Sequence, residues 1–409
     1  MKGPVVRPYF IATPFILALA VVLVACGGST NKATLPGESA SPAAPAATLT
    51  PAAQAQDLRF LDFPTAGWRT DFRKHSVPLS EISSGGPPKD GIPAIDQPKF
   101  ETVVEASRWL DDREPVQVLA IKDAVNIYPF QILIWHEIVN DVVGGMPVAV
   151  TYCPLCNTAI AFDARLPDGR ALDFGTTGNL RFSDLVMYDR QTESWWQQAT
   201  GEAIVGELTG TRLHMLPSLV VSWGEAKRQF PQAKVLSRNT GYSRPYGENP
   251  YVGYDKGEPL LYQGPLDRRL PALERVVGIA AGQSALAVPF SELARQPVAQ
   301  GRVGDQDFVV FFEGTTASAL GAATIKDGRD VGSAAVYDPE VDGVKLTFRK
   351  EGDVFVDDQT GTRWNLLGTA VSGPLAGRKL RPLVSWSGQF WFSWVVFKPD
   401  TAIYRGAGG

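Results

Sequence analysis

A repeated block constrains the fold of this 409-residue chain more than any other feature of its sequence. The stretch DRQTESWWQQATGEAIVGELTGTRL at 189–213 recurs as DDQTGTRWNLLGTAVSGPLAGRKL at 357–380. One gap keeps a threonine, a tryptophan and three glycines in step, which chance similarity rarely does. The chain is therefore expected to build one supersecondary unit twice.

The similarity continues upstream of this block. VLAIKDAVNIYPFQIL at 118–133 resembles VVGIAAGQSALAVPFSEL at 276–293, and VAVTYCPLCNTAIAF at 148–162 aligns with FVVFFEGTTASALGA at 308–322. We expect two related units, at about 100–245 and 265–405, joined by the tyrosine-rich loop GYSRPYGENPYVGYD. The expected domains are accordingly an N-terminal unit at 57–255, which carries the cysteine and histidine residues, and a degenerate repeat at 256–409.

Short runs of β-branched and aromatic residues dominate both units. Runs such as VQVLAI, PVAVTYC, LVMYDR, DFVVFF and WFSWVVF are bounded by Gly, Pro, Asp and Asn, which predicts short strands. Only FQILIWHEIVND and LVVSWGEAKRQF have apolar residues at helical spacing. The predicted fold class is mainly β with short helices, a β-rich α+β fold. One closed barrel per unit and a shared sandwich both agree with this pattern.

The second unit serves as an internal control for candidate functional residues. Small and apolar positions persist between the units, whereas four polar or sulfur-bearing side chains change. At the aligned positions Cys153 becomes Glu313, Cys156 becomes Thr316, His136 becomes Gln296 and His214 becomes Arg381. The fold therefore does not require these four residues, which favours a chemical role for them in the first unit.

The pair Cys153 and Cys156 in TYCPLCNTAIAFD permits three interpretations. A strand-turn-strand context, with Asn157 in a left-handed conformation, would direct both thiolates to one point, and His136 and His214 would complete a metal site. Zinc suits such a set, and copper(I) would suit it with an added methionine. Alternatively, the cysteines act as redox-active or nucleophilic thiols, or they form a structural disulfide or pack as small apolar side chains.

The N-terminal region predicts the location of the protein. Residues 1–26 combine a basic start, a short apolar stretch and a small-residue site that ends in Cys26, which is typical of a lipoprotein signal peptide with Cys26 as the lipidated residue. Residues 27–56 are rich in Ala, Pro, Ser and Thr and predict a flexible tether. We expect an extracytoplasmic protein that is anchored in the lipid bilayer. The slightly negative net charge and the absence of a basic run argue against nucleic acid as a partner.

Five motifs together indicate a family. KDGIPAID, YPFQILIWHEIVND, PVAVTYCPLCNTAIAFD, GNLRFSDLVMYDRQTESWWQQATGEAIVG and WGEAKRQFPQAKVLSRNTGY resemble the bacterial and archaeal family of domain of unknown function 3179 (DUF3179). The resemblance covers most of the chain beyond the tether. It implies no particular reaction, but it implies that His136, Cys153 and Cys156 belong to the family's pattern and form its candidate site.

Two classes of function agree with the sequence. In the first, the thiolate site binds a soft metal ion or performs thiol chemistry. In the second, a non-catalytic binding or scaffold lipoprotein holds a small molecule or a protein partner, and the cysteines form a structural disulfide.

Overall fold

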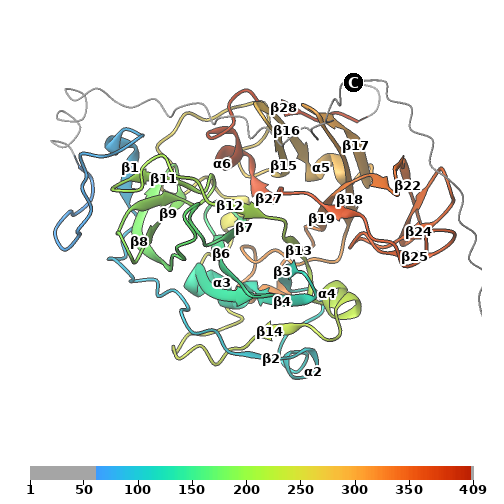
Figure 1. Ribbon diagram of the computed structural model, residues 1–409, viewed down its shortest axis with the longest axis horizontal. Coiled ribbons are helices and arrows are strands. Elements are labelled where there is room, and N and C mark those ends of the chain that lie inside the picture. The colour runs from blue at the N-terminus through green and yellow to red at the C-terminus, as the bar shows by residue number, and fades with distance from the viewer. Residues whose placement is uncertain (1–60, 407–409) are drawn as a thin grey trace, which may run out of the picture. The chain divides into compact units, whose positions relative to one another are not determined.

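The computed structural model describes residues 61–406, whose helices and strands are drawn in Figure 1. The predicted signal peptide at 1–26, its lipidation site Cys26 and the predicted tether at 27–56 lie outside the described residues. None of the helices within 61–406 has the length and apolar character that a membrane span requires.

Three sheets make up the first half of the described chain. The first sheet has the order β1 (Ile82–Ser84), β8 (Phe174–Arg181), β9 (Asp184–Asp189), β10 (Trp195–Gln197) and β11 (Glu202–Val205). The second has the order β12 (His214–Leu216), β7 (Thr158–Asp163), β6 (Met146–Cys153) and β5 (Ile138–Val143). The third has the order β13 (Leu219–Ser222), β3 (Pro115–Ile121), β4 (Ala124–Pro129), β14 (Lys234–Leu236) and β2 (Phe100–Thr102).

The second half builds three corresponding sheets and one additional hairpin. The first has the order β22 (Phe348–Glu351), β23 (Val354–Asp357), β24 (Arg363–Trp364) and β25 (Ala370–Ser372). The second has the order β26 (Arg381–Pro382), β19 (Ser333–Asp338), β18 (Gln306–Glu313) and β17 (Val298–Val303). The third has the order β27 (Trp386–Phe390), β15 (Arg275–Ala281), β16 (Ser284–Pro289) and β28 (Ala402–Ile403), and the hairpin pairs β20 (Glu340–Val341) with β21 (Val344–Lys345).

The strand order is the same in both halves, which confirms the predicted β-rich fold built from an internal repeat. The sheet β12-β7-β6-β5 corresponds strand for strand to β26-β19-β18-β17, and the sheet β13-β3-β4-β14 corresponds to β27-β15-β16-β28. Even the single parallel pair recurs, since β14 pairs with β4 and β28 pairs with β16.

Buried polar contacts repeat along with the strands. Asp189 accepts a hydrogen bond from Trp196 Nε1 at 3.0 Å, and Asp357 accepts one from Trp364 Nε1 at 2.9 Å. Each aspartate also accepts the backbone N–H of the threonine three residues later, at 2.6 Å. These aspartates therefore fix a turn in each half, as the repeat in the sequence suggests.

The helices are short, and two of them begin directly after a proline. Pro129 precedes α3 (Phe130–His136) with φ −65°, and Pro289 precedes α5 (Phe290–Leu293) with φ −66°, a value that proline fixes before a helix begins. The remaining helices are α2 (Val103–Ala106), α4 (Trp223–Gln229) and α6 (Trp391–Val395), with 3-10 turns η1 (Leu79–Glu81), η2 (Tyr254–Lys256) and η3 (Ile325–Asp327).

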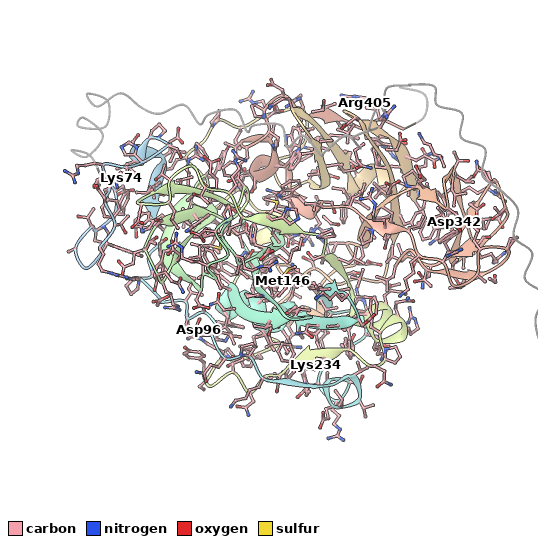
Figure 2. All side chains as sticks on the ribbon, viewed as in Figure 1. Lys74, Asp96, Met146, Lys234, Asp342 and Arg405 are labelled. Carbon is pink, nitrogen blue, oxygen red and sulfur yellow. The ribbon has the colours of Figure 1, made fainter. Side chains whose placement is uncertain are left out.

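The two halves pack against each other reciprocally. Strand β27 of the second half contacts β7 of the first, and their counterparts β13 of the first half and β19 of the second also contact each other. Side chains fill the space between the sheets (Figure 2), and the largest buried cluster contains Phe162 and Trp196 from one half and Trp386 and Phe390 from the other. The halves therefore share a core, and the first half's candidate site is built against the second.

Candidate functional site

The segment with both cysteines is a tight turn between two strands. Cys153 ends β6 and Thr158 begins β7, and the Asn157 N–H donates to the Pro154 carbonyl at 3.2 Å. Asn157 has φ 49°, so the predicted left-handed conformation is confirmed. This strand-turn-strand arrangement differs from the helix N-terminus that usually lowers the pKa of a redox-active cysteine.

The second half forms one wall of this turn. The Asn157 amide nitrogen donates to the Gly388 carbonyl at 2.6 Å, and the Phe390 N–H donates to the Cys156 carbonyl at 3.0 Å. Tyr254 of the connecting segment donates its hydroxyl to the Leu155 carbonyl at 2.7 Å. The turn is thus held by hydrogen bonds to two other parts of the chain, β27 and the connecting segment.

A buried aspartate lies close to the two cysteines. Cys153, Cys156 and Asp184 are all buried, and one ligand atom from each lies within 4.8 Å of the others. Both thiols are free. Asp184 comes from the first position of β9, which pairs with β8 far from the cysteine turn in sequence. Two sulfur atoms and one carboxylate thus converge on one point inside the protein.

Only one oxygen of Asp184 is occupied by hydrogen bonds. Oδ2 accepts the Gln197 amide at 2.5 Å and the Ala199 N–H at 2.9 Å, which fixes the carboxylate. Oδ1 is buried and has no hydrogen-bond partner among residues 61–406. A buried acceptor without a partner is costly, and the Cys156 thiol is the group close enough to hydrogen-bond the carboxylate, so this oxygen is open to a proton or a cation.

Glu137 is a second buried carboxyl group near the thiols. It ends α3 with φ 59°, a left-handed conformation that usually favours glycine or asparagine at the end of a helix. Burial, together with the nearby charge of Asp184, raises the pKa of Glu137 to about 8, and burial raises the pKa of Asp184 to about 6. A strained, buried acid at this place is typical of a functional residue.

Burial also determines whether the two thiols are protonated. It raises the pKa of Cys153 and of Cys156, and the negative charge of Asp184 raises both further. In the absence of a cation, these cysteines therefore hold their protons at neutral pH and are poor nucleophiles.

His136 lies outside this group. Its Nδ1 contacts the Pro93 carbonyl at 2.7 Å and its Nε2 contacts the Tyr246 hydroxyl at 2.6 Å, so both ring nitrogens have partners within the protein. Asn140, four residues further along the chain, does not contact this ring, because helix α3 ends before it; Asn140 lies in β5 and donates to Asp96 at 2.7 Å.

His214 is also distant from the pair of thiols. It begins β12 at an exposed position and pairs with Asp163 at the far end of β7 from the cysteine turn. Among residues 61–406, the group of possible ligands that includes the cysteines contains no histidine. The structure therefore brings together Cys153 and Cys156 of the predicted set, and it adds Asp184 in place of the two histidines.

The buried ring of His136 predicts a dependence of stability on pH. Burial lowers its pKa from 6.5 to about 4, so the unfolded chain takes up a proton before the folded protein does. The contribution of His136 to the free energy of unfolding is complete above pH 6.5 and is lost as the pH falls toward 4. The total loss is up to about 3 kcal/mol. Urea unfolding at about pH 7, 5 and 4 should show this loss, and His136→Gln should show a shallower dependence. Equal pH dependence of the wild type and the variant would show that His136 does not cause the loss of stability.

A cavity of about 340 Å³ adjoins the cysteine turn. Glu137 and Cys153 line it together with mainly apolar side chains from the loop at 85–92, strand β8 and the connecting segment. Tyr251 of the tyrosine-rich loop also lines it. Cys153 and Glu137 therefore face a chamber large enough for a small molecule, whereas Cys156 and Asp184 lie behind them and do not line it.

Comparison with protein families identifies the chain. The model of the family described as "Protein of unknown function (DUF3179)" matches residues 89–401, which include every residue of the site. The chain belongs to the DUF3179 family. Comparison with curated proteins and with solved structures gave no match.

The second half of this DUF3179 protein has other residues at the positions of the cysteine and the two acids of the candidate site. Positions that are equivalent relative to the paired strands show the differences: Cys153 corresponds to Glu313, Glu137 before β5 to Pro297 before β17, and Asp184 to Gly352 before β23. The loop at 314–332 replaces the turn at 154–157. Because Cys156 and Thr316 lie in connections of different length, their predicted match is wrong. The same sheets thus form without any of these acids.

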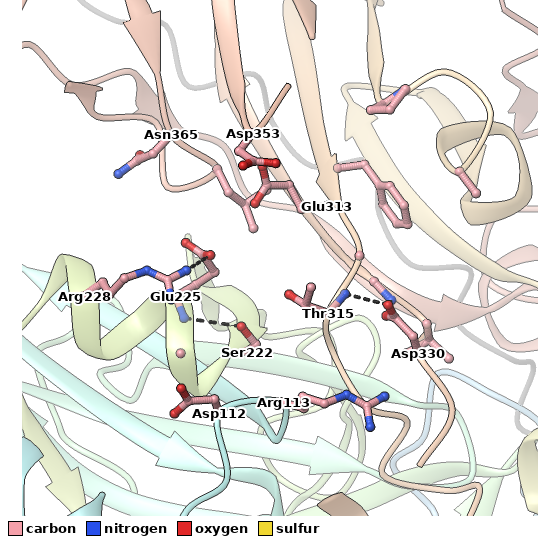
Figure 3. A pocket seen from close by; sticks show the side chains of 18 of the residues that line it. Asp112, Arg113, Ser222, Glu225, Arg228, Glu313, Thr315, Asp330, Asp353 and Asn365 are labelled. Carbon is pink, nitrogen blue, oxygen red and sulfur yellow. Dashed lines mark hydrogen bonds and ion pairs between the residues drawn. The ribbon is translucent and has the colours of Figure 1, made fainter. Parts of the chain in front are cut away.

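A larger cavity, of about 1060 Å³, lies where the second half meets helix α4 (Figure 3). Glu313 lines it and pairs with Lys350, and Glu225 pairs with Arg228. Asp330 accepts the backbone N–H groups of its own loop. Each of these three carboxylates thus already has a partner within the protein.

Proposed function

We propose that this DUF3179 protein binds one zinc ion through Cys153, Cys156 and Asp184. The observation that carries the proposal is the convergence of two sulfur atoms and a carboxylate within 4.8 Å, with Oδ1 of that carboxylate buried and unpartnered among the described residues. A divalent cation would bind this oxygen and would compensate the charge of two thiolates.

The geometry and the ligand types suit zinc. Zinc–thiolate bonds of about 2.3 Å in a tetrahedral site place two sulfurs about 3.8 Å apart, so small side-chain movements would complete the site. Copper(I) prefers an all-sulfur or nitrogen environment, whereas zinc accepts a carboxylate together with thiolates. Three protein ligands would leave the fourth position free, which is the arrangement of catalytic rather than structural zinc sites.

The environment of the thiols favours metal binding over unaided thiol chemistry. A nucleophilic cysteine requires a lowered pKa, but burial raises the pKa of both thiols here. Zinc would displace their protons and would remove this obstacle. The free state of both thiols is also the state that binds a metal ion.

The location belongs to the same proposal. The signal-like sequence at 1–26 and the composition of 27–56 support an extracytoplasmic protein that a lipid on Cys26 anchors to the membrane. The zinc site would then lie outside the cytoplasm, in a domain tethered to the bilayer.

Metal analysis of the purified protein tests the proposal. We expect about one equivalent of zinc per chain, and we expect Cys153→Ser and Asp184→Asn to lose it, because each removes one of three ligands. Cys26→Ser is the matched control, since it removes the third cysteine of the chain and should keep the zinc. Thiol titration before and after reduction accompanies each measurement.

Two results would contradict the zinc site. One is a reduced protein that binds no zinc when zinc is added. The other is a pair that is fully oxidised on purification and has no free thiol before reduction, which would support the structural disulfide instead.

A further inference from the structure

The cavity beside Cys153 has the character of a small-molecule site. Its volume of about 340 Å³ lies in the range of such sites, which are mostly apolar with a few polar groups at fixed places. Ile92, Leu155, Leu180 and Leu185 contribute apolar walls, and the polar groups of Glu137 and Cys153 lie among them.

The charges around the cavity restrict the class of ligand. Within the part of the chain that the structure describes, no lysine, arginine or histidine lines it, so an anion would find no countercharge among these side chains. Among the described residues, Glu137 is its one acidic lining residue, and it is buried among apolar side chains. A carboxyl group at this place can form a hydrogen bond with the polar group of a ligand.

The rim of the cavity is apolar and exposed. Leu260 and Leu261 line the cavity with side chains that are 48% and 50% exposed. They belong to the segment that connects the two halves, and Ser183 fixes this segment by donating to the Leu260 carbonyl at 2.6 Å. A bound apolar molecule would cover both leucines and remove their surface from water.

We propose that this cavity binds a small, uncharged and mainly apolar organic molecule whose polar group is directed toward Glu137 and Cys153. The contact with a metal ion rests on the proposed function, whereas the binding of the molecule does not. With zinc in place, the polar group of the ligand would reach the free fourth position of the metal. The site would then combine a substrate chamber, a Lewis acid and a buried carboxylic acid.

Titration of the full chain with N-phenyl-1-naphthylamine, a neutral apolar fluorophore, tests this proposal. We expect saturable binding at one site with a rise in fluorescence. Leu261→Asp should weaken it about tenfold, because a charge replaces an apolar contact. Leu261 has φ 55°, a left-handed conformation that aspartate adopts more readily than leucine, so this variant should fold.

Leu266→Asp is the matched control. Leu266 is also 50% exposed and lies in the same segment, but it does not line the cavity, so its replacement should leave binding unchanged. Absence of saturable binding, or equal binding by wild type and Leu261→Asp, would overturn the proposal.

Zinc content measured on the same samples separates the two proposals. If the fluorophore binds in a way that depends on Leu261 while no zinc is bound, the cavity proposal stands and the zinc proposal fails. If zinc is bound and the fluorophore is not, the zinc proposal stands and the cavity proposal fails.

Discussion

Adding zinc to the metal-free, reduced protein is expected to raise its free energy of unfolding by about 4 kcal/mol once free zinc exceeds the dissociation constant about 1,000-fold. The reason is that Cys153, Cys156 and Asp184 converge only in the folded chain, since β9 carries the aspartate and the β6–β7 turn carries the thiols. Binding to the folded state alone shifts the equilibrium toward it. Denaturant unfolding with and without zinc, at constant pH and in the presence of a thiol reductant, measures the difference.

Asp184→Asn provides the strongest control for this experiment. It retains the size of the side chain and an oxygen that can accept the Ala199 N–H, so the fold should persist, but it removes the charge that would bind the metal. We expect zinc to stabilise this variant much less than the wild type. Equal stabilisation of both proteins would show that zinc binds elsewhere or that Asp184 is not a ligand.

Gly178→Ala is expected to lower the free energy of unfolding by about 4 kcal/mol, because it combines a left-handed conformation with a steric overlap. Gly178 has φ 76°, and a Cβ atom there would lie 1.9 Å from the Pro87 carbonyl oxygen. The loop at 85–90 would have to move, although backbone hydrogen bonds tie it to β8, among them Gly85 N–H to Gly178 carbonyl at 2.8 Å. Urea unfolding of the variant measures the loss.

Gly169→Ala separates the two causes of this effect. Gly169 has φ 87°, but a Cβ atom there would meet nothing within 4 Å, so only the left-handed conformation is penalised, by about 1 kcal/mol. The difference between the two variants therefore measures the steric overlap. If both variants lost the same stability, the close packing of the loop at 85–90 against β8 would be disproved.

The sequence predicted the features that depend on local pattern or on repetition. The aligned tryptophans Trp196 and Trp364 sit on equivalent strands and donate to equivalent aspartates, because a repeat of sequence carries a repeat of hydrogen bonds with it. Cys153 and Cys156 were recognisable as one site because only two residues separate them. Asn157 was recognisable from its own conformational preference.

The rest of the site depends on long-range pairing that no local pattern encodes. Asp184 lies near the cysteines only because β9 folds back on β8. The sequence around Asp184 predicts only the start of a strand. Glu137 had one local signal, an acid at the end of a helical pattern where glycine or asparagine is usual. The sequence suggested His136 as a metal ligand, but its ring nitrogens contact Pro93 and Tyr246 instead. These partners come from loops whose positions the sequence does not define.

The reciprocal contacts of β7 with β27 and of β13 with β19 have an evolutionary consequence. A homodimer with a twofold axis would exchange the same strands between two identical chains, so an ancestor of half the length could have buried these surfaces as a dimer. Fusion of two copies would release one of them from retaining the group of thiols and carboxyls. The longer connection at 314–332, and the glutamate that ends β18 where the other copy has Cys153, are the changes that such a release permits. The second half would then be a former subunit that now serves as scaffold for the first.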